Sequence, residues 1–259
     1  MFAALGISAL VGYLLGSVNF AVLVAKRYGI DILKEGSGNP GATNVKRVLG
    51  KGPGNLVFAL DALKGAAGTG LGYVIAYIIY LRPIFDKLLE ADAVNKLLEP
   101  DAVTHPNKTL LMHFQDFLVS VTNIGNYSDV DVLFAIVAAG FVGTLLGHCF
   151  SCFLGFKGGK GVASTIGGLL VLLPVPIVIG AALWAIAFYT TRYVSVASLA
   201  LGLSLPLSCW LLPKFTSLQF GTAQLVFAGA IALFNVWTHR SNIGRLVRGE
   251  ENKFTKQAS

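Results

Sequence analysis

The chain has 259 residues, of which 54% are hydrophobic and 13% are charged. A soluble domain usually carries about 25% charged residues, so this composition indicates a membrane protein and argues against a soluble enzyme. The net charge of +7 fits Lys and Arg in loops that face anionic lipid. No recognised nucleic-acid-binding module is visible, and we therefore expect no nucleic-acid partner.

Apolar runs follow one another along the chain, and a helix of about 20 residues is long enough to cross a bilayer. Two proline or polar breaks divide the long apolar stretch over 162–212, namely Pro174-Val175-Pro176 and Thr190-Thr191-Arg192. Because proline marks helix boundaries and short helices are tolerated beside polar cavities, we predict separate segments there. The predicted segments are 2–25, 55–81, 132–147, a short helix or half-helix at 162–173, 177–190, 194–212 and about 223–237.

Two basic segments predict the orientation, because Lys and Arg concentrate in cytoplasmic loops. The first holds Lys26, Arg27, Lys34, Lys46, Arg47 and Lys51, and the tail holds Arg240, Arg245, Arg248, Lys253 and Lys256. Both can be cytoplasmic only if an even number of crossings separates them. We therefore predict an all-α membrane protein with about seven transmembrane helices, some short or broken, with the N-terminus outside and the C-terminus cytoplasmic.

The segment 83–131 is richer in acidic than in basic residues and is expected to lie outside the cytoplasm as an insertion. Apolar residues recur at helical spacing over 84–98, with charged residues between them. This pattern predicts an amphipathic helix on the membrane surface. We expect residues 1–259 to form one multi-pass domain.

Several other polar residues and cysteines admit both a functional and a structural interpretation. Asp61 and Lys64 lie one turn apart in the second predicted span, so they are either a functional intramembrane pair or a structural pair near the membrane surface. His148 is either a functional residue of the second polar loop or a structural group that caps a helix end or packs the loop. Cys149 and Cys152 form a CxxC without a second pair, and a zinc site needs about four ligands, so we expect no metal.

Three polar loops carry the residue types that bind phosphate. Residues 36–44 are followed by Arg47, residues 147–161 include Lys160 in a glycine-rich run, and residues 239–251 begin with His239 and Arg240. Closely spaced glycines let backbone N–H groups converge on an anion. Arg offers a planar fork that matches phosphate. Three such loops on one face of a membrane protein favour a phosphate-rich substrate at the bilayer surface.

The three loops resemble the signature motifs of the PlsY family, the acylphosphate:glycerol-3-phosphate acyltransferases. The matching stretches are Gly36-Ser37-Gly38-Asn39-Pro40-Gly41-Ala42-Thr43-Asn44, Gly147-His148 with Phe156-Lys157-Gly158-Gly159-Lys160-Gly161, and His239-Arg240-Ser241-Asn242-Ile243. Residues 61–65 and 191–195 also resemble that family. The likeness covers most of the chain apart from about 83–131, which makes this chain longer than a typical member.

The resemblance implies a multi-pass enzyme of the bacterial inner membrane with its active site on the cytoplasmic side. It would transfer a fatty acyl chain from a long-chain acyl phosphate to the 1-hydroxyl of glycerol 3-phosphate, giving lysophosphatidic acid, with no cofactor. A functional link to the enzyme that makes acyl phosphate is expected. Acyltransferases that use thioesters typically show His, four residues and Asp, and none of His105, His113, His148 or His239 has Asp five positions on.

By the resemblance, activity depends most on Ser37, Arg47, His239 and Asn242. We expect substrate or phosphate to be bound by Gly36, Gly38, Asn39, Gly41, Thr43, Asn44, Gly158, Gly159, Lys160, Gly161 and Ser195. Glu250 is expected to pair with a cation and fix the third loop. His239 has a suitable intrinsic pKa for a general base, but the departing phosphate could equally take the proton.

Two other function classes remain open from the residues alone. A carrier for a phosphorylated metabolite would also place cations among short helices, although no internal repeat of the kind common in transporters is visible. A scaffold protein would not need this density of phosphate-type groups on one side.

Overall fold

The computed structural model describes residues 1–83 and 127–254, and these residues are helical apart from short connections, with no β-strand among them. The predicted all-α class is therefore confirmed. The helices in chain order are α1 Phe2–Ser17, α2 Phe20–Arg27, α3 Ala42–Leu49, α4 Lys51–Ile75 with the π-helix η1 Ala76–Leu81, α8 Tyr127–Cys149, the 3-10 helix η3 Cys152–Leu154, α9 Val162–Leu172, α10 Pro174–Thr191, α11 Val194–Phe215, α12 Thr222–Thr238 and α13 Arg240–Val247.

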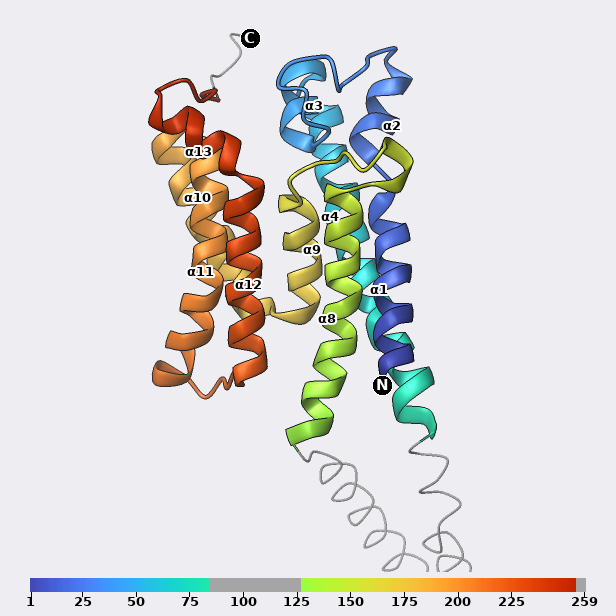
Figure 1. The fold of residues 1–259 in the computed structure, drawn as a ribbon. Helices are drawn as coiled ribbons and strands as arrows, with labels where there is room; N and C mark the ends of the chain where they lie inside the picture. Colours follow the sequence, from blue (N-terminus) through green and yellow to red (C-terminus); the bar gives the residue numbers. More distant parts are fainter. Residues whose placement is uncertain (84–126, 255–259) are drawn as a thin grey trace, which may run out of the picture.

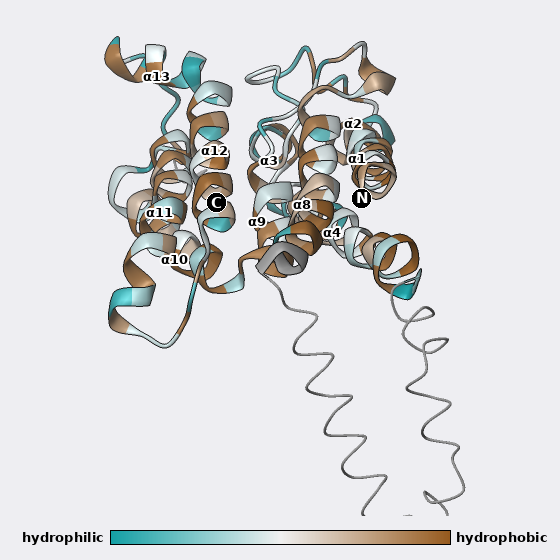
Figure 2. Ribbon diagram, turned by 60° about the horizontal axis from the view of Figure 1, so that its bottom comes forward, coloured by the Kyte–Doolittle hydropathy of each residue, from teal (hydrophilic) through white to brown (hydrophobic). Residues whose placement is uncertain are grey.

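Five helical segments in the described part of the chain are long and apolar enough to cross a membrane, namely 2–27, 51–81, 131–149, 174–191 and 194–215. Two shorter apolar helices, α9 and α12, accompany them. Large apolar side chains such as Leu10, Leu203 and Leu233 are more than half exposed, and hydrophobic residues line much of the helical surface (Figure 2). The count of seven crossings and the side on which each terminus lies stay predictions.

The first predicted span is broken within its length, which differs from the continuous helix expected over 2–25. Val18 adopts an extended conformation after α1, and the side chain of Asn19 caps α2 by accepting a hydrogen bond from the Val22 N–H at 3.0 Å. Asn is a favourable N-cap because its side chain satisfies a helix N–H that would otherwise lack a partner. The chain therefore changes direction at residues 17–19, here called the α1–α2 junction.

The long apolar stretch divides as predicted into α9, α10 and α11. Pro174 occupies the first turn of α10, where its missing N–H costs no helical hydrogen bond. The preceding residue, Leu173, leaves the helical region with φ −137° and ψ 66°. The second break follows α10 at Arg192, which has φ 65°.

The predicted amphipathic helix over 84–98 and most of the expected insertion lie outside the described residues. At the C-terminal end of that segment, α8 begins at Tyr127. Residues 127–131, expected to belong to the insertion, are therefore part of a helix.

Glycines allow α1, α4, α8 and α9 to pack with their backbones in close approach. A Cβ added at Gly143 in α8 would overlap the carbonyl oxygen of Ala9 in α1, and one added at Gly65 in α4 would overlap that of Ser164 in α9. In a bilayer no hydrophobic driving force brings helices together, so close van der Waals packing through small residues supplies much of the attraction. These four helices form a tightly packed group.

The helices α10, α11, α12 and α13 form a second group beside the first (Figure 1). Aromatic side chains fill the boundary between the two groups. The ring of Phe227 in α12 lies with its centroid 5.5 Å from that of Phe134 and 5.7 Å from that of Phe141, both in α8. Nearer the polar end, Phe150 packs against Trp237 at 5.8 Å.

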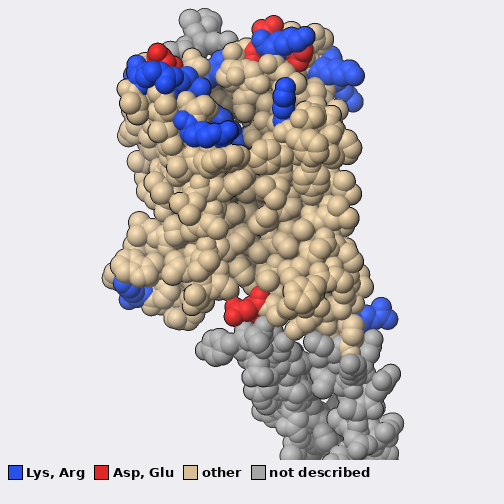
Figure 3. Space-filling model, viewed as in Figure 1, with Lys and Arg blue, Asp and Glu red and all other residues tan. Residues whose placement is uncertain are grey.

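Basic side chains gather at one end of the molecule, where α3 and α13 lie, whereas the middle of the same face is uncharged (Figure 3). The N-terminus of α1 lies near the opposite end, and the described chain ends at the basic end (Figure 1). The three polar loops predicted to share one face therefore do share one end of the bundle.

We expect Gly143→Ala to destabilise the protein, because its new methyl group would meet the Ala9 carbonyl. Overpacking of this kind costs about 1–3 kcal/mol, so the melting temperature in detergent should fall by several degrees. Gly70→Ala is the matched control, since nothing lies within 4 Å of its added Cβ, and it should leave the melting temperature unchanged or raise it. Equal melting temperatures for the two variants would contradict the close packing of α1 against α8.

Candidate active site

The first polar loop is held in shape by Asn44, which lies on α3 and is 1% exposed. Its Oδ1 accepts a hydrogen bond from the Ser37 N–H at 2.8 Å, and its Nδ2 donates to the carbonyls of Ile32 at 3.2 Å and Glu35 at 2.9 Å. Gly36 has φ 59°, and a Cβ there would overlap Asn44 Oδ1. Asn44 therefore braces the loop, which differs from the phosphate-binding role expected for it.

Four other side chains of this segment do not hold the loop in shape. Ser37 is exposed, and Asn39, Thr43 and Arg47 are partly exposed. Within the described part of the chain, none of these four side chains makes a hydrogen bond to another residue. Thr43 and Arg47 lie four residues apart in α3 and so share one helix face. These groups are available to a ligand.

The glycines of the second loop pack against the end of α8. The Gly159 N–H donates to the His148 carbonyl at 3.1 Å, and an added Cβ on Gly158 or Gly159 would overlap His148. Gly161 adopts φ 80° before α9, with Leu145 against it. Close packing requires glycine at these positions, and their expected role in phosphate binding stays a prediction.

Lys160 is surrounded by positive charge. Its Nζ donates a hydrogen bond to Oδ1 of Asn242. Burial and the charges of Arg245 and Arg47 together lower the pKa of Lys160 to about 8, while Glu251 acts in the opposite direction. The charges of Arg47 and Arg245, from two other segments, therefore act on Lys160, and Glu251 is the carboxylate that offsets them. This arrangement favours the binding of an anion.

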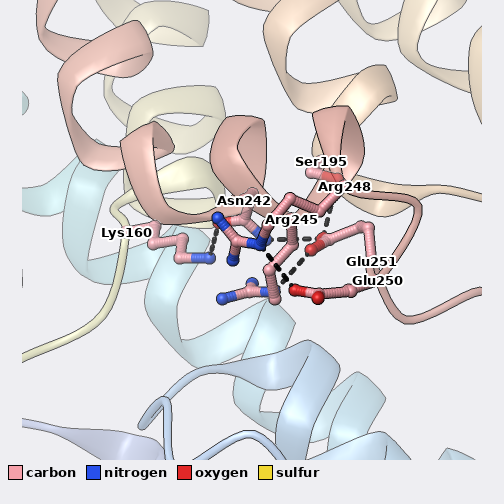
Figure 4. A network of polar contacts seen from close by, with 7 residues as sticks. All are labelled: Lys160, Ser195, Asn242, Arg245, Arg248, Glu250 and Glu251. Carbon is pink, nitrogen blue, oxygen red and sulfur yellow. Dashed lines mark hydrogen bonds and ion pairs between the residues drawn. The ribbon is translucent and has the colours of Figure 1, made fainter.

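A network around Glu251 connects the third segment to α11 (Figure 4). Oε1 of Glu251 accepts hydrogen bonds from Ser195 Oγ at 2.8 Å and Asn242 Nδ2 at 2.6 Å, and Oε2 lies 2.8 Å from Arg245 Nε. Burial acts to raise the pKa of Glu251, but the hydrogen bonds from Asn242, Ser195 and Arg245 lower it overall. Glu251 is therefore a charged acceptor that fixes the orientation of Asn242 and Arg245.

The structure adds contacts to two residues singled out in this segment and in α11. Glu250 does pair with a cation, Arg248 at 2.7 Å, but both side chains are more than half exposed, and the acid that holds the network is Glu251. Ser195, expected to contact substrate, is 3% exposed and donates its hydroxyl to Glu251. Sequence reasoning missed Glu251 and Arg245. The one signal was the acidic pair at 250–251 in a basic tail, which does not tell which acid faces inward.

His239 ends α12 and is 2% exposed. Its Nδ1 lies 2.9 Å from the carbonyl oxygen of Asn235, and a carbonyl only accepts, so we place the proton of the neutral ring on Nδ1. Burial lowers the pKa of His239 to about 4, with the charge of Lys160 acting in the same direction. At neutral pH the ring is uncharged and its Nε2 carries a lone pair that can accept a hydrogen bond.

No group of three or more His, Cys, Asp and Glu side chains that could hold a metal ion occurs within residues 1–83 and 127–254. Fold and site together define a multi-pass membrane protein with an anion-binding cluster at one end of its helices. The family model for glycerol-3-phosphate acyltransferase matches residues 6–97 and 107–249. The chain belongs to this family.

Known proteins are similar to this chain over nearly its whole length. A glycerol-3-phosphate acyltransferase of Shouchella clausii is 32% identical over 258 residues, covering 99% of both chains. One of Halalkalibacterium halodurans is 35% identical over 248 residues, covering 95% of this chain and 93% of the relative. The crystal structure of PlsY, an integral membrane glycerol 3-phosphate acyltransferase, in its glycerol 3-phosphate form has a TM-score of 0.66 at 29% identity, covering 97% of this chain and 96% of that one. Its lysophosphatidic acid form has a TM-score of 0.65 at 30% identity.

We expect Glu251→Gln to lower acyl transfer to glycerol 3-phosphate by about tenfold or more, because loss of a charge-assisted hydrogen bond costs about 1.5–3 kcal/mol and releases Asn242 and Arg245. Glu250→Gln is the matched control, since it changes an exposed pair of little energetic value, and it should keep full activity. The rates of both purified variants in detergent test the assignment. A greater loss in Glu250→Gln would reverse it.

Proposed function

We propose that the chain transfers a fatty acyl group from an acyl phosphate to the 1-hydroxyl of glycerol 3-phosphate, giving 1-acyl-glycerol 3-phosphate and inorganic phosphate. The observation that carries the proposal is that Lys160 and Arg245 lie together around Asn242 and Glu251 (Figure 4), with Arg47 near enough for its charge to act on Lys160. Family membership and the glycerol 3-phosphate and lysophosphatidic acid forms of the similar PlsY structure support it.

An acyl phosphate is a mixed anhydride and needs no further activation. The 1-hydroxyl oxygen forms a bond to the acyl carbon, the bond from that carbon to the phosphate oxygen breaks, and its electron pair leaves with phosphate. The hydroxyl proton passes to a base. Both substrates carry a phosphate dianion, so the protein's contribution is to hold two like charges together and to stabilise the leaving phosphate.

Each proposed role follows from the position of the side chain. Arg47, Lys160 and Arg245 neutralise the two phosphates, and the side chains of Ser37 and Thr43 donate hydrogen bonds to them. Catalytic groups under this proposal are Ser37, Arg47, His239 and Asn242, with the backbone of Gly36, Gly38 and Gly41 and the side chain of Asn39 near the phosphate. Asn242 is fixed between Lys160 and Glu251 and is thereby oriented towards the cation cluster.

Two groups can take the hydroxyl proton. The Nε2 lone pair of His239 is one, and its low pKa of about 4 makes it a weak base in the empty site. Binding of two dianions beside Lys160 would raise that pKa and strengthen the base. The phosphate that leaves is the other. In the first case the neutral His239 accepts the hydrogen bond that orients the attacking hydroxyl, and in the second case an oxygen of the phosphate accepts it.

The proposal extends to cellular context. We propose that the chain lies in the bacterial inner membrane as a single multi-pass domain, with the basic end and the active site in the cytoplasm, where Lys and Arg concentrate. An enzyme that makes long-chain acyl phosphate would then supply the donor from the same compartment.

The donor is tested by offering labelled glycerol 3-phosphate with palmitoyl phosphate or palmitoyl-CoA to purified protein in detergent. We expect lysophosphatidic acid from palmitoyl phosphate alone, and a loss of about 100-fold in Ser37→Ala and His239→Ala, because misplaced or missing contacts cost this much. Lys34→Ala, which changes an exposed side chain paired with Asp31, should keep its rate. Protein that binds glycerol 3-phosphate but forms no product with either donor would contradict the enzyme and favour a carrier.

Lys160 gives the reaction a pH dependence on the alkaline side. Its pKa is lowered to about 8, and its charged form binds phosphate, so the KM for glycerol 3-phosphate should rise as the pH increases through about 8. In Lys160→Arg the guanidinium stays charged, so the rise should disappear, while titration of the substrate is the same for both proteins. A rise that persists unchanged in Lys160→Arg would show that another group titrates.

A further inference from the structure

Beneath the candidate active site lies a buried ion pair that the proposed reaction does not use. Asp61 Oδ1 and Lys64 Nζ in α4 are 2.9 Å apart, and both side chains are 2% exposed. Burying an ion pair costs desolvation energy that its mutual attraction often does not recover, and charges inside spanning helices are expensive. The contacts of the pair point to a role beyond helix packing.

Lys64 reaches from α4 to the α1–α2 junction, where its Nζ donates a hydrogen bond to the Val18 carbonyl at 2.6 Å. In a continuous helix the Val22 N–H would bond to this carbonyl. Here that N–H bonds to the Asn19 side chain instead, so the break leaves the Val18 carbonyl free for Lys64. The pair thus fixes the position at which the chain changes direction.

The same junction holds the first loop of the active site. The Nδ2 of Asn19 donates to the Pro40 carbonyl at 3.4 Å, and Pro40 lies between Ser37 and α3, the helix that carries Arg47. A shift of the junction would therefore move the segment with both of these phosphate-binding side chains.

The junction, the end of α1 and the ion pair also contact the second loop. Ser151 Oγ donates to the Ser17 carbonyl at 2.5 Å, and the hydroxyl of Tyr13 donates to the Phe150 carbonyl at 2.8 Å. His148 Nδ1 lies 3.5 Å from Asp61 Oδ1, and the His148 carbonyl accepts the Gly159 N–H next to Lys160.

We infer that Asp61 and Lys64 are positioning residues, which set the first and second loops at the relative position that binds the two phosphates. This inference rests on the proposed phosphate-binding role of those loops. The pair itself does not contact substrate under this inference. It positions the first loop through the α1–α2 junction and Pro40, and the second loop through His148 and Gly159.

The test replaces the pair together, since Lys64→Met alone would leave Asp61 as an uncompensated buried charge and destabilise the fold. Replacing both partners by apolar residues of similar size is often neutral, so Asp61→Leu/Lys64→Met should fold. We expect its KM for glycerol 3-phosphate to rise about tenfold or more, because small displacements of binding groups carry large kinetic costs. A merely structural role would lower the fraction of folded enzyme, which reduces the maximal rate and leaves KM unchanged.

Asn19→Ser is an independent variant for the first loop. Serine can still cap α2 but lacks the amide that donates to Pro40, so KM should rise with little change in melting temperature. Ser8→Ala is the matched control, because it removes one buried hydrogen bond between α1 and α8, to the Ile136 carbonyl, without touching the junction. Its KM should equal that of the unmodified protein.

Lys160→Ala separates this inference from the proposed site. A raised KM in Lys160→Ala together with a normal KM in both Asp61→Leu/Lys64→Met and Asn19→Ser would overturn the positioning role and leave the site intact. A normal KM in Lys160→Ala would overturn the phosphate-binding role of the loop and the inference with it. A raised KM in all three, with Ser8→Ala unaffected, is the result that we expect.

Discussion

The placement of Lys160 in a buried position, where the charges of Arg245 and Arg47 act on it, is the constraint on which the site depends. Burial and these neighbouring charges lower the pKa of Lys160 to about 8, and Glu251 offsets part of the effect. Because Glu251 is itself engaged by Ser195, Asn242 and Arg245, positive charge remains that a phosphate dianion can neutralise. Anionic substrates relieve this unfavourable repulsion, which favours binding two of them close to each other.

Such a cluster needs a rigid support, and a bilayer offers little hydrophobic drive for helices to associate. Glycines on α1, α4, α8 and α9 supply it by close backbone contact, as at Gly143 against Ala9. The support ends in loops that are tied down by buried polar groups, Asn44 in the first and His148 in the second. Most glycines on these helices are explained by close packing, and a positive φ is required only at a few glycines in the loops.

The sequence predicts the features that depend on local pattern. Apolar runs and the prolines at 174 and 176 locate α9, α10 and α11, and the glycine-rich and basic motifs locate the polar end. What it does not reveal depends on contacts across long separations in the chain. Glu251 and Ser195 are 56 residues apart, so neither the inward direction of Glu251 nor the bracing role of Ser195 follows from their own segments. The break at Asn19 was not predicted, because the polar residues Ser17 and Asn19 lie within an otherwise apolar run long enough to form one helix.

The central claim is that glycerol 3-phosphate binds among the three cations, and an experimental structure of the complex tests it most directly. The account predicts that phosphate oxygens lie about 3 Å from the nitrogens of Lys160 and of Arg47 or Arg245, with the 1-hydroxyl facing Nε2 of His239. Glycerol 3-phosphate bound elsewhere on the basic end, with these side chains arranged as in the empty protein, would contradict it.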